Sequence, residues 1–205
     1  MYQSVLVLCL AVLMIAHPVM AADSAPLTRE QKSTIAQDKA ELIEQSIVDG
    51  GSESRPDPAV AITRPGIAAV DPAGASPLDD AITCLARAVY WEAKGEGTDD
   101  MAAVANVVMN RLADAGFPDT ICGVVKQGGE QGYCQFSWWC DGRGDDVQEP
   151  QRYAIVKEVA RQALNGQLSD HTGGAMFFHQ RTIRPYWAAE FTETASIGDF
   201  IFYKP

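Results

Sequence analysis

The chain has 205 residues and a formal net charge of −11, from 27 acidic and 16 basic side chains. Its composition is 47% hydrophobic and 21% charged, which is typical of globular proteins and excludes a disordered or fibrous chain. The length allows one domain with extensions, or two small domains. An acidic chain lacks the positive charge that nucleic acids and anionic membrane surfaces attract, so no nucleic-acid partner is expected.

The N-terminus has the pattern of an export signal. Residues 5–16 (VLVLCLAVLMIA) form an apolar run of 12, which is too short for a comfortable transmembrane helix. Small residues follow at Ala21 and Ala22, so we predict a signal peptide over 1–21 and a periplasmic or secreted protein. The alternative is an uncleaved anchor, and contact with a membrane is expected only in that case.

Residues 22–76 are predicted to be a spacer. Thr28 and Gln31 have the spacing of a capping box, so a charged helix is expected from there to about Val48. Its thin apolar stripe would contain Ile35, Leu42, Ile43 and Ile47. Residues 50–76 are rich in Gly, Pro, Ala and Ser, and we predict a flexible linker because they offer little apolar surface to bury.

A compact domain is predicted over 77–205. Ser76 is a candidate N-cap with Pro77 at the first helical position, so a helix is expected from there to about Ala93. Further helices are predicted from Thr98, from Thr120 and over 150–164, and short β segments over 175–179, 191–196 and 199–203. This order indicates a helix-rich α+β fold with a small β element near the C-terminus.

Glu92 is the carboxylate with the most informative position. It would lie in the last helical turn, about 60° from the centre of the buried stripe. Partial burial and the negative end of the helix dipole both raise a carboxyl pKa, which suits a general acid. The alternative is a solvated glutamate paired with Lys94 or Arg87. Glu96 would share its face only if the helix continued, and the glycines at 95 and 97 argue against that.

The segment 133–142 (YCQFSWWCDG) places aromatic rings beside amides and hydroxyls. Aromatic faces cover the apolar faces of sugars, and short polar groups bond their hydroxyls. The candidate sugar contacts are Tyr133, Gln135 and Ser137. The alternative is a structural loop in which Trp138 or Trp139 fills the core.

Four cysteines remain after removal of the signal: Cys84, Cys122, Cys134 and Cys140. An even number in an exported chain predicts two disulfides. Three pairings are open, and the sequence does not choose among them. One of them closes a short loop between Cys134 and Cys140 and joins the other two.

Neither a metal nor a cofactor is expected. The cysteines have no CxxC spacing, and His171 and His179 are not spaced like a standard metal site. No P-loop, GxGxxG, HExxH or GxSxG element is present.

Several collinear segments resemble one known family. Residues 84–97 (CLARAVYWEAKGEG) are similar to the AxxxYxEAxGE signature of the SleB-type cell wall hydrolases, the spore-cortex-lytic enzyme family. Further segments that resemble it are 104–111, 117–125, 134–142, 177–179, 185–187 and 197–203, several of them with the pattern of a Gram-negative branch. The resemblance covers 80–205 and leaves the first 79 residues unmatched. Trp91 departs from the pattern, which often has Gly or another aromatic residue there.

The resemblance implies a lysozyme-like catalytic domain that acts as a lytic transglycosylase on peptidoglycan glycan strands. Such an enzyme cleaves the β-1,4 bond between N-acetylmuramic acid and N-acetylglucosamine. By motif position Glu92 would protonate the glycosidic oxygen and then accept the proton of the muramoyl 6-hydroxyl, giving a 1,6-anhydro product. Glu96, His179, Tyr186 and Trp187 fall in or beside the matched segments and are predicted to contact the glycan.

Two alternatives remain open. One is a hydrolysing muramidase, in which Glu92 is the acid and a second carboxylate such as Glu96 or Asp141 activates water. The other is a glycan-binding module without activity. A monomer is expected in each case.

Overall fold

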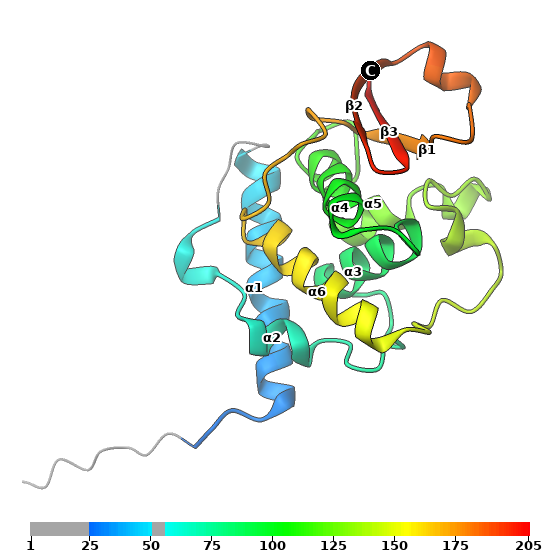
Figure 1. Ribbon diagram of the computed structural model, residues 1–205. Coiled ribbons are helices and arrows are strands. Elements are labelled where there is room, and N and C mark those ends of the chain that lie inside the picture. Colours follow the sequence, from blue (N-terminus) through cyan, green and yellow to red (C-terminus); the bar gives the residue numbers. More distant parts are fainter. Residues whose placement is uncertain (1–24, 51–55) are drawn as a thin grey trace, which may run out of the picture.

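The computed structural model describes residues 25–50 and 56–205, so the predicted signal peptide lies outside the described residues. The described chain forms six α-helices and one three-stranded sheet (Figure 1). The helices are α1 (Arg29–Gly50), α2 (Arg64–Ala69), α3 (Ala81–Glu92), α4 (Thr98–Leu112), α5 (Ile121–Lys126) and α6 (Pro150–Leu164). The strands are β1 (Phe177–Gln180), β2 (Thr192–Ile197) and β3 (Phe200–Lys204). The predicted helix-rich α+β fold is confirmed.

Helix α3 is the centre of the fold. Every residue from Ala81 to Tyr90 is buried, because α4, α5 and α6 pack around it and α1 covers a further side. The sheet has the order β1-β3-β2 with both pairs antiparallel, and it lies at the α4 and α5 side of the bundle, away from α2 (Figure 1). The C-terminal end of α3 is therefore framed by helices, by the loop before α6 and by the sheet.

Local capping sets most helix ends. Thr28 and Gln31 form the predicted capping box, with the Gln31 amide donating to Thr28 Oγ1 at 3.2 Å and the Thr28 amide donating to Gln31 Oε1 at 2.9 Å. Thr120 caps α5 by accepting from the Gly123 amide, as predicted. The predicted start of α3 at Ser76 is wrong: α3 begins after Asp80, whose carboxylate accepts from the Thr83 amide at 2.9 Å.

The prediction of a flexible linker over 50–76 is wrong for its described part. Residues 56–76 form a short 3₁₀ helix (Pro58–Val60), then α2, and pack onto α1 and α6. The buried side chains include Ile62, Ile67 and Val70. The composition was misleading because these few aliphatic side chains are buried although the sequence around them is rich in Gly, Pro and Ala.

Helix α1 is also part of the folded unit. Its buried face is narrow and consists of Ala36, Ala40, Ile43 and Ile47. Two small alanines allow a close approach of α1 to its neighbours, which a stripe of large residues would prevent. Ile35 and Leu42, which the sequence placed on the stripe, are exposed.

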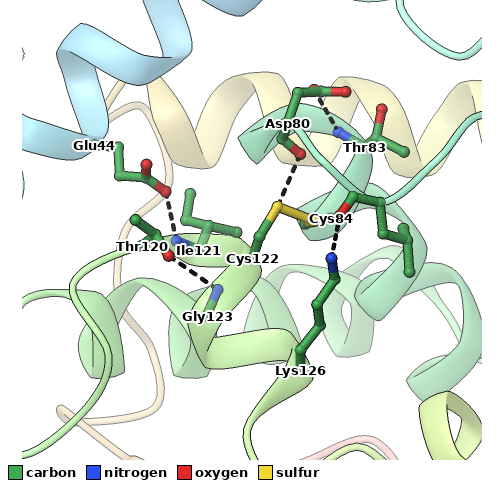
Figure 2. The surroundings of a disulfide bond; sticks show 10 residues. Glu44, Asp80, Thr83, Cys84, Thr120, Ile121, Cys122, Gly123 and Lys126 are labelled. Atoms are coloured by element: carbon green, nitrogen blue, oxygen red, sulfur yellow. Dashed lines mark hydrogen bonds between the residues drawn. A yellow bond between two sulfur atoms is a disulfide. The ribbon is translucent and has the colours of Figure 1, made fainter.

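Two disulfides are present, as predicted, and the tertiary structure selects their pairing. Cys84 of α3 is bonded to Cys122 of α5, and Cys134 is bonded to Cys140. Figure 2 shows the first bond between the two helices, with Glu44 of α1 accepting from the Ile121 amide. Lys126 donates to the Leu78 carbonyl. Helix α5 is thus attached at both ends to elements that precede it in the chain.

None of the helices in the described part of the chain has the length and the apolar composition that a bilayer span requires.

Candidate active site

Glu92 is the last residue of α3, and its side chain is largely removed from solvent. Burial raises its pKa from 4.5 to about 7, because the carboxylate loses hydration, while the positive charge of Arg111 opposes the shift. The sequence predicted this direction. A carboxyl with this pKa populates both its acid and its carboxylate form near neutral pH.

Arg111 lies at the end of α4 and is completely buried. Its Nε donates to the Met176 carbonyl at 2.6 Å. The rings of Phe117, Phe136 and Phe177 surround the guanidinium, with ring centroids 5.2–5.4 Å from Cζ. Burial lowers the pKa of Arg111 to about 10, and the charge of Glu92 opposes this shift.

In the sequence, Arg111 stands out only as the last residue of the segment 104–111, which resembles the SleB-type family. An available signal was its spacing: Arg111 lies seven residues after Val104 and three after Val108, on the buried face of α4, where an arginine is unusual. The aromatic residues around it come from three separate segments, and no local pattern connects them.

Polar contacts hold the segment 145–149 against the end of α3. The Tyr90 hydroxyl accepts from the Gln148 and Glu149 amides at 3.1 and 3.2 Å. The Trp91 indole donates to the Asp145 carbonyl at 3.1 Å. Trp91, the residue that departs from the family pattern, therefore fastens this segment next to Glu92.

Arg152 of α6 binds the turn that follows the C-terminal end of α3. Its Nη2 donates to the Ala93 carbonyl at 2.7 Å and to the Glu96 carbonyl at 2.5 Å. A cation at this position neutralises the negative end of the helix dipole and fixes the turn that carries Glu92.

Glu96 does not share a helical face with Glu92. Helix α3 ends at Glu92, and Gly95 adopts a positive φ of 96° that an ongoing helix does not allow. Glu96 instead faces Asp199, and its pKa is raised by partial desolvation and by the charges of Asp199 and Asp100. The sequence expectation that the glycines separate the two glutamates is confirmed.

The segment 133–142, which contains the Cys134–Cys140 disulfide, has an inner and an outer face. Phe136 and Trp138 are buried. Trp138 therefore fills the core, as in the alternative interpretation of this segment as a structural loop. Tyr133, Gln135 and Ser137 are exposed, and Tyr133 retains 86% of its accessible surface. The predicted sugar contacts in this loop are therefore all accessible to a ligand.

Asp141, the other candidate second carboxylate, lies on the outer face of the same loop. It accepts from the Arg143 amide at 2.8 Å, and its carboxylate is 3.9 Å from the Arg143 guanidinium.

The candidate glycan contacts near the C-terminus also differ in their exposure to solvent. His179 is buried, with Nδ1 2.9 Å from its neighbour's carbonyl (Gln180) and Nε2 3.1 Å from the Tyr203 hydroxyl. Since a carbonyl only accepts, Nδ1 carries a hydrogen and donates it to the Gln180 carbonyl. The His179 ring is buried against Tyr203, on which it stacks, and against the edge of Trp187, so the expected glycan contact at His179 is not supported.

Trp187 is half-buried in an aromatic cluster with Phe177, His179, Phe191 and Tyr203. Its neighbour Tyr186 is 87% exposed. Phe177 belongs to this cluster and also touches the Arg111 guanidinium, so the sheet packs directly against the end of α4.

Within the described ranges no group of three or more His, Cys, Asp or Glu side chains is placed to hold a metal ion.

A family model for cell wall hydrolases matches residues 95–203, just over half of the chain. The chain belongs to the cell wall hydrolase family. The match begins three residues after Glu92 and includes Arg111, the disulfide-closed loop and the sheet. The resemblance to the SleB-type hydrolases is thereby confirmed.

Individual members of the family extend the match to the segment before residue 95. A spore cortex-lytic enzyme of Halalkalibacterium halodurans is 37% identical over 136 residues, which is 64% of this chain and 36% of that protein. The spore cortex-lytic enzyme of Bacillus subtilis is 31% identical over 146 residues, 71% of this chain and 44% of that protein. The chain therefore spans less than half the length of these curated cell wall hydrolases.

One solved structure has the same fold. It is the catalytic domain of the germination-specific lytic transglycosylase SleB from Bacillus anthracis, with 30% identity and a TM-score of 0.50. The alignment covers 98% of that domain and 64% of this chain. This cell wall hydrolase thus contains nearly the whole of that catalytic fold, together with additional residues.

Proposed function

We propose that this protein cleaves the glycan strands of peptidoglycan as a lytic transglycosylase, at the β-1,4 bond between N-acetylmuramic acid and N-acetylglucosamine. One observation carries the proposal: a largely buried carboxyl with a pKa of about 7, Glu92, ends the central helix of a fold shared with a solved lytic transglycosylase domain. Protonation of a leaving oxygen needs an acid of this kind at neutral pH.

In the proposed reaction Glu92 acts twice. Its protonated form donates a proton to the glycosidic oxygen as the bond from C1 to that oxygen breaks. The resulting carboxylate then accepts the proton of the muramoyl 6-hydroxyl, whose oxygen bonds to C1 and forms the 1,6-anhydro ring. Glu92 thereby returns to its protonated form, and no water is consumed.

Exposed aromatic and polar side chains are the proposed glycan contacts. Tyr133 and Tyr186 are supported by their exposure of 86% and 87%, because rings so free of packing offer a whole face to a sugar. Gln135 and Ser137 would bond hydroxyl and N-acetyl groups from the same loop as Tyr133. We also propose that Glu96 contacts the glycan, at the edge of the surface formed by these four side chains. We further propose that the protein acts as a monomer without a cofactor.

Digestion of purified peptidoglycan by the wild type and by Glu92→Gln tests the proposal. Mass spectrometry of the released muropeptides should find 1,6-anhydromuramic ends with the wild type and a loss of at least about 1,000-fold in rate with the variant. Equal activity of the variant would refute the role of Glu92.

The ends of the released muropeptides also distinguish a lytic transglycosylase from the alternative functions. Reducing ends would instead indicate a hydrolysing muramidase, and Glu96→Gln and Asp141→Asn would then identify its second carboxylate. Binding without cleavage by both proteins would indicate a glycan-binding module.

We also propose that the protein is exported. The apolar run at 5–16 and the small residues at 21–22 support removal of residues 1–21. N-terminal sequencing of the mature protein and fractionation of cells that produce it would test both the cleavage and the choice between periplasm and medium. An unprocessed N-terminus in the membrane fraction would favour the anchor.

A further inference from the structure

We propose that the turn 71–76, which follows α2, is a positioning element for the proposed active site: it holds the segment 145–149 in the place that Glu92 needs for cleavage. Its positioning residues are Asp71 and Gly74. This inference rests on the proposed function, because it concerns the surroundings of Glu92 in that reaction. The family model for cell wall hydrolases begins after Glu92, so it does not include this turn.

The turn is bonded directly to the segment 145–149. The Val147 amide donates to the Gly74 carbonyl at 2.8 Å. Gly74 has a positive φ of 68°, and a Cβ at this position would lie 2.3 Å from the Val147 Cβ. The turn and the segment therefore approach each other so closely that only a glycine fits at position 74.

Asp71 makes a second connection, through Arg87. The Arg87 Nε donates to Asp71 Oδ2 at 3.0 Å, and its Nη1 donates to the Asp145 carbonyl. Both side chains of the ion pair are buried. Among the described residues Asp71 is the one non-glycine residue with a positive φ, which is 42°. Such a conformation costs free energy, and residues held in it are concentrated at functional sites.

The segment 145–149 in turn fixes both neighbours of Glu92. Its first residue accepts, through the backbone carbonyl, from the Trp91 indole at 3.1 Å. The segment then leads into α6, where Arg152 Nη2 donates to the Ala93 carbonyl at 2.7 Å. A displacement of the segment would therefore move groups that are bonded to the residues directly before and after Glu92.

The simpler alternative is that the turn 71–76 only stabilises the fold. A purely structural role would change the fraction of folded molecules, but it would leave the kcat and KM of the folded molecules unchanged. A displacement beside the reacting groups lowers kcat instead, since a shift of about 1 Å can reduce a rate by about 100-fold.

Gly74→Ala is the decisive variant, and Gly174→Ala is its matched control. The new Cβ of Gly74→Ala must push Val147 away by roughly 1 Å, because ordinary contacts of a Cβ begin at 3.4 Å. Gly174 also has a positive φ, of 78°, but a Cβ there would meet no atom of the described residues within 4 Å. The control therefore carries a similar backbone strain without the collision. Circular dichroism first establishes that both variants are folded.

Cleavage of soluble peptidoglycan fragments gives the first readout. We expect the kcat of Gly74→Ala to fall by about 10- to 100-fold, with KM within about twofold of the wild type. Gly174→Ala should keep kcat within about twofold. In a Val147→Gly background, which lacks the colliding side chain, Gly74→Ala should change kcat by less than about threefold.

The Trp91 indole N–H gives a readout that does not depend on activity. Its hydrogen bond to the Asp145 carbonyl should weaken in Gly74→Ala, so its ¹H NMR resonance should move upfield and the proton should exchange faster with solvent. Gly174→Ala should leave this resonance in place, and Trp91→Phe assigns it. The proposal requires both the shift of the resonance and the fall in kcat, and either one without the other would overturn it.

Val147→Gly alone takes the place of Gly74→Ala if that variant does not fold. Val147 is half-buried, so its substitution should leave the protein folded while it removes the side chain that lies against the turn. The kcat should then fall at least about fivefold with an unchanged KM, and a wild-type kcat would contradict the proposal. A wild type that does not cleave peptidoglycan would refute the proposed function itself, whereas a cleaving wild type with unaffected variants would refute only this inference.

Discussion

Asp71 and Arg87 form an ion pair that is closed to solvent, with Oδ2 and Nε 3.0 Å apart and only 1% and 2% of the side chains exposed. Arg87 belongs to α3, five residues before Glu92, and Asp71 follows α2. The Tyr153 hydroxyl donates to the same Oδ2 at 2.7 Å. The segment before residue 77 is therefore joined to the central helix α3 through this buried ion pair.

We predict that Asp71→Asn strongly destabilises the protein. The variant keeps the size of the side chain but leaves Arg87 buried without a counter-charge, which costs about 3–5 kcal/mol. Urea unfolding at pH 7 measures the loss. Arg64→Gln, which removes the ion pair of an exposed arginine with Glu158, is the control and should cost about 1 kcal/mol or less. Equal effects of the two changes would contradict the buried pairing.

The same pair predicts an acid limit to stability. Burial alone would raise the pKa of Asp71, but the hydrogen bonds from Tyr153 and the Ser76 amide and the charge of Arg87 lower it below 3.8. A lowered carboxyl pKa gives stability that is complete above pH 3.8 and is lost as the pH falls through the folded-state value. The difference between the wild type and Asp71→Asn should therefore shrink in that acidic range.

Glu92→Gln should make the protein more stable at alkaline pH while it removes activity. A carboxyl whose pKa rises from 4.5 to about 7 on folding opposes folding once it is ionised. The variant should gain up to about 3 kcal/mol over the wild type above pH 7, and the gain should disappear below pH 4.5. Urea unfolding at pH 4 and pH 8 measures this gain in stability. A gain of the same size at both pH values would show that burial does not shift the pKa of Glu92.

A chain that begins at residue 77 should not fold as a stable unit. It lacks five buried aliphatic side chains, namely Ile43, Ile47, Ile62, Ile67 and Val70. Burial of each contributes roughly 1.5–3 kcal/mol, so their sum is comparable with the whole stability of a domain. Thermal unfolding followed by circular dichroism should find a cooperative transition for 25–205 and a weak or absent one for 77–205. Matching transitions would restore the interpretation of 22–76 as a spacer.

Tyr133→Ala and Tyr186→Ala should weaken the binding of peptidoglycan without loss of stability. Both rings are exposed, so their removal should change the free energy of unfolding by less than about 0.5 kcal/mol. Sedimentation with insoluble peptidoglycan, using Glu92→Gln as an inactive background, measures the affinity. Trp187→Ala is the matched contrast: its ring packs in the aromatic cluster, and its loss should cost about 2 kcal/mol or more. Unchanged sedimentation by both tyrosine variants would remove them from the glycan surface.

The sequence alone determined the features that depend on neighbours in the chain. The capping box at Thr28, the cap at Thr120 and the bounds of α6 are set by hydrogen bonds and apolar periods within a few residues. The position of Glu92 at a helix end, with its raised pKa, followed from the same local rules. The start of α3 was missed because Ser76 was the expected cap, whereas in the structure the carboxylate of Asp80 accepts from the Thr83 amide.

Only the tertiary structure decided which side chains meet across long stretches of sequence. Asp71 reaches Arg87 and Tyr153, and Arg111 is enclosed by rings from separate loops and a strand. The burial of His179 likewise depends on distant residues, because its ring packs against Trp187 and Tyr203. A local pattern measures hydrophobicity and propensity along the chain, whereas burial and electrostatic pairing depend on distances in space, which packing alone fixes.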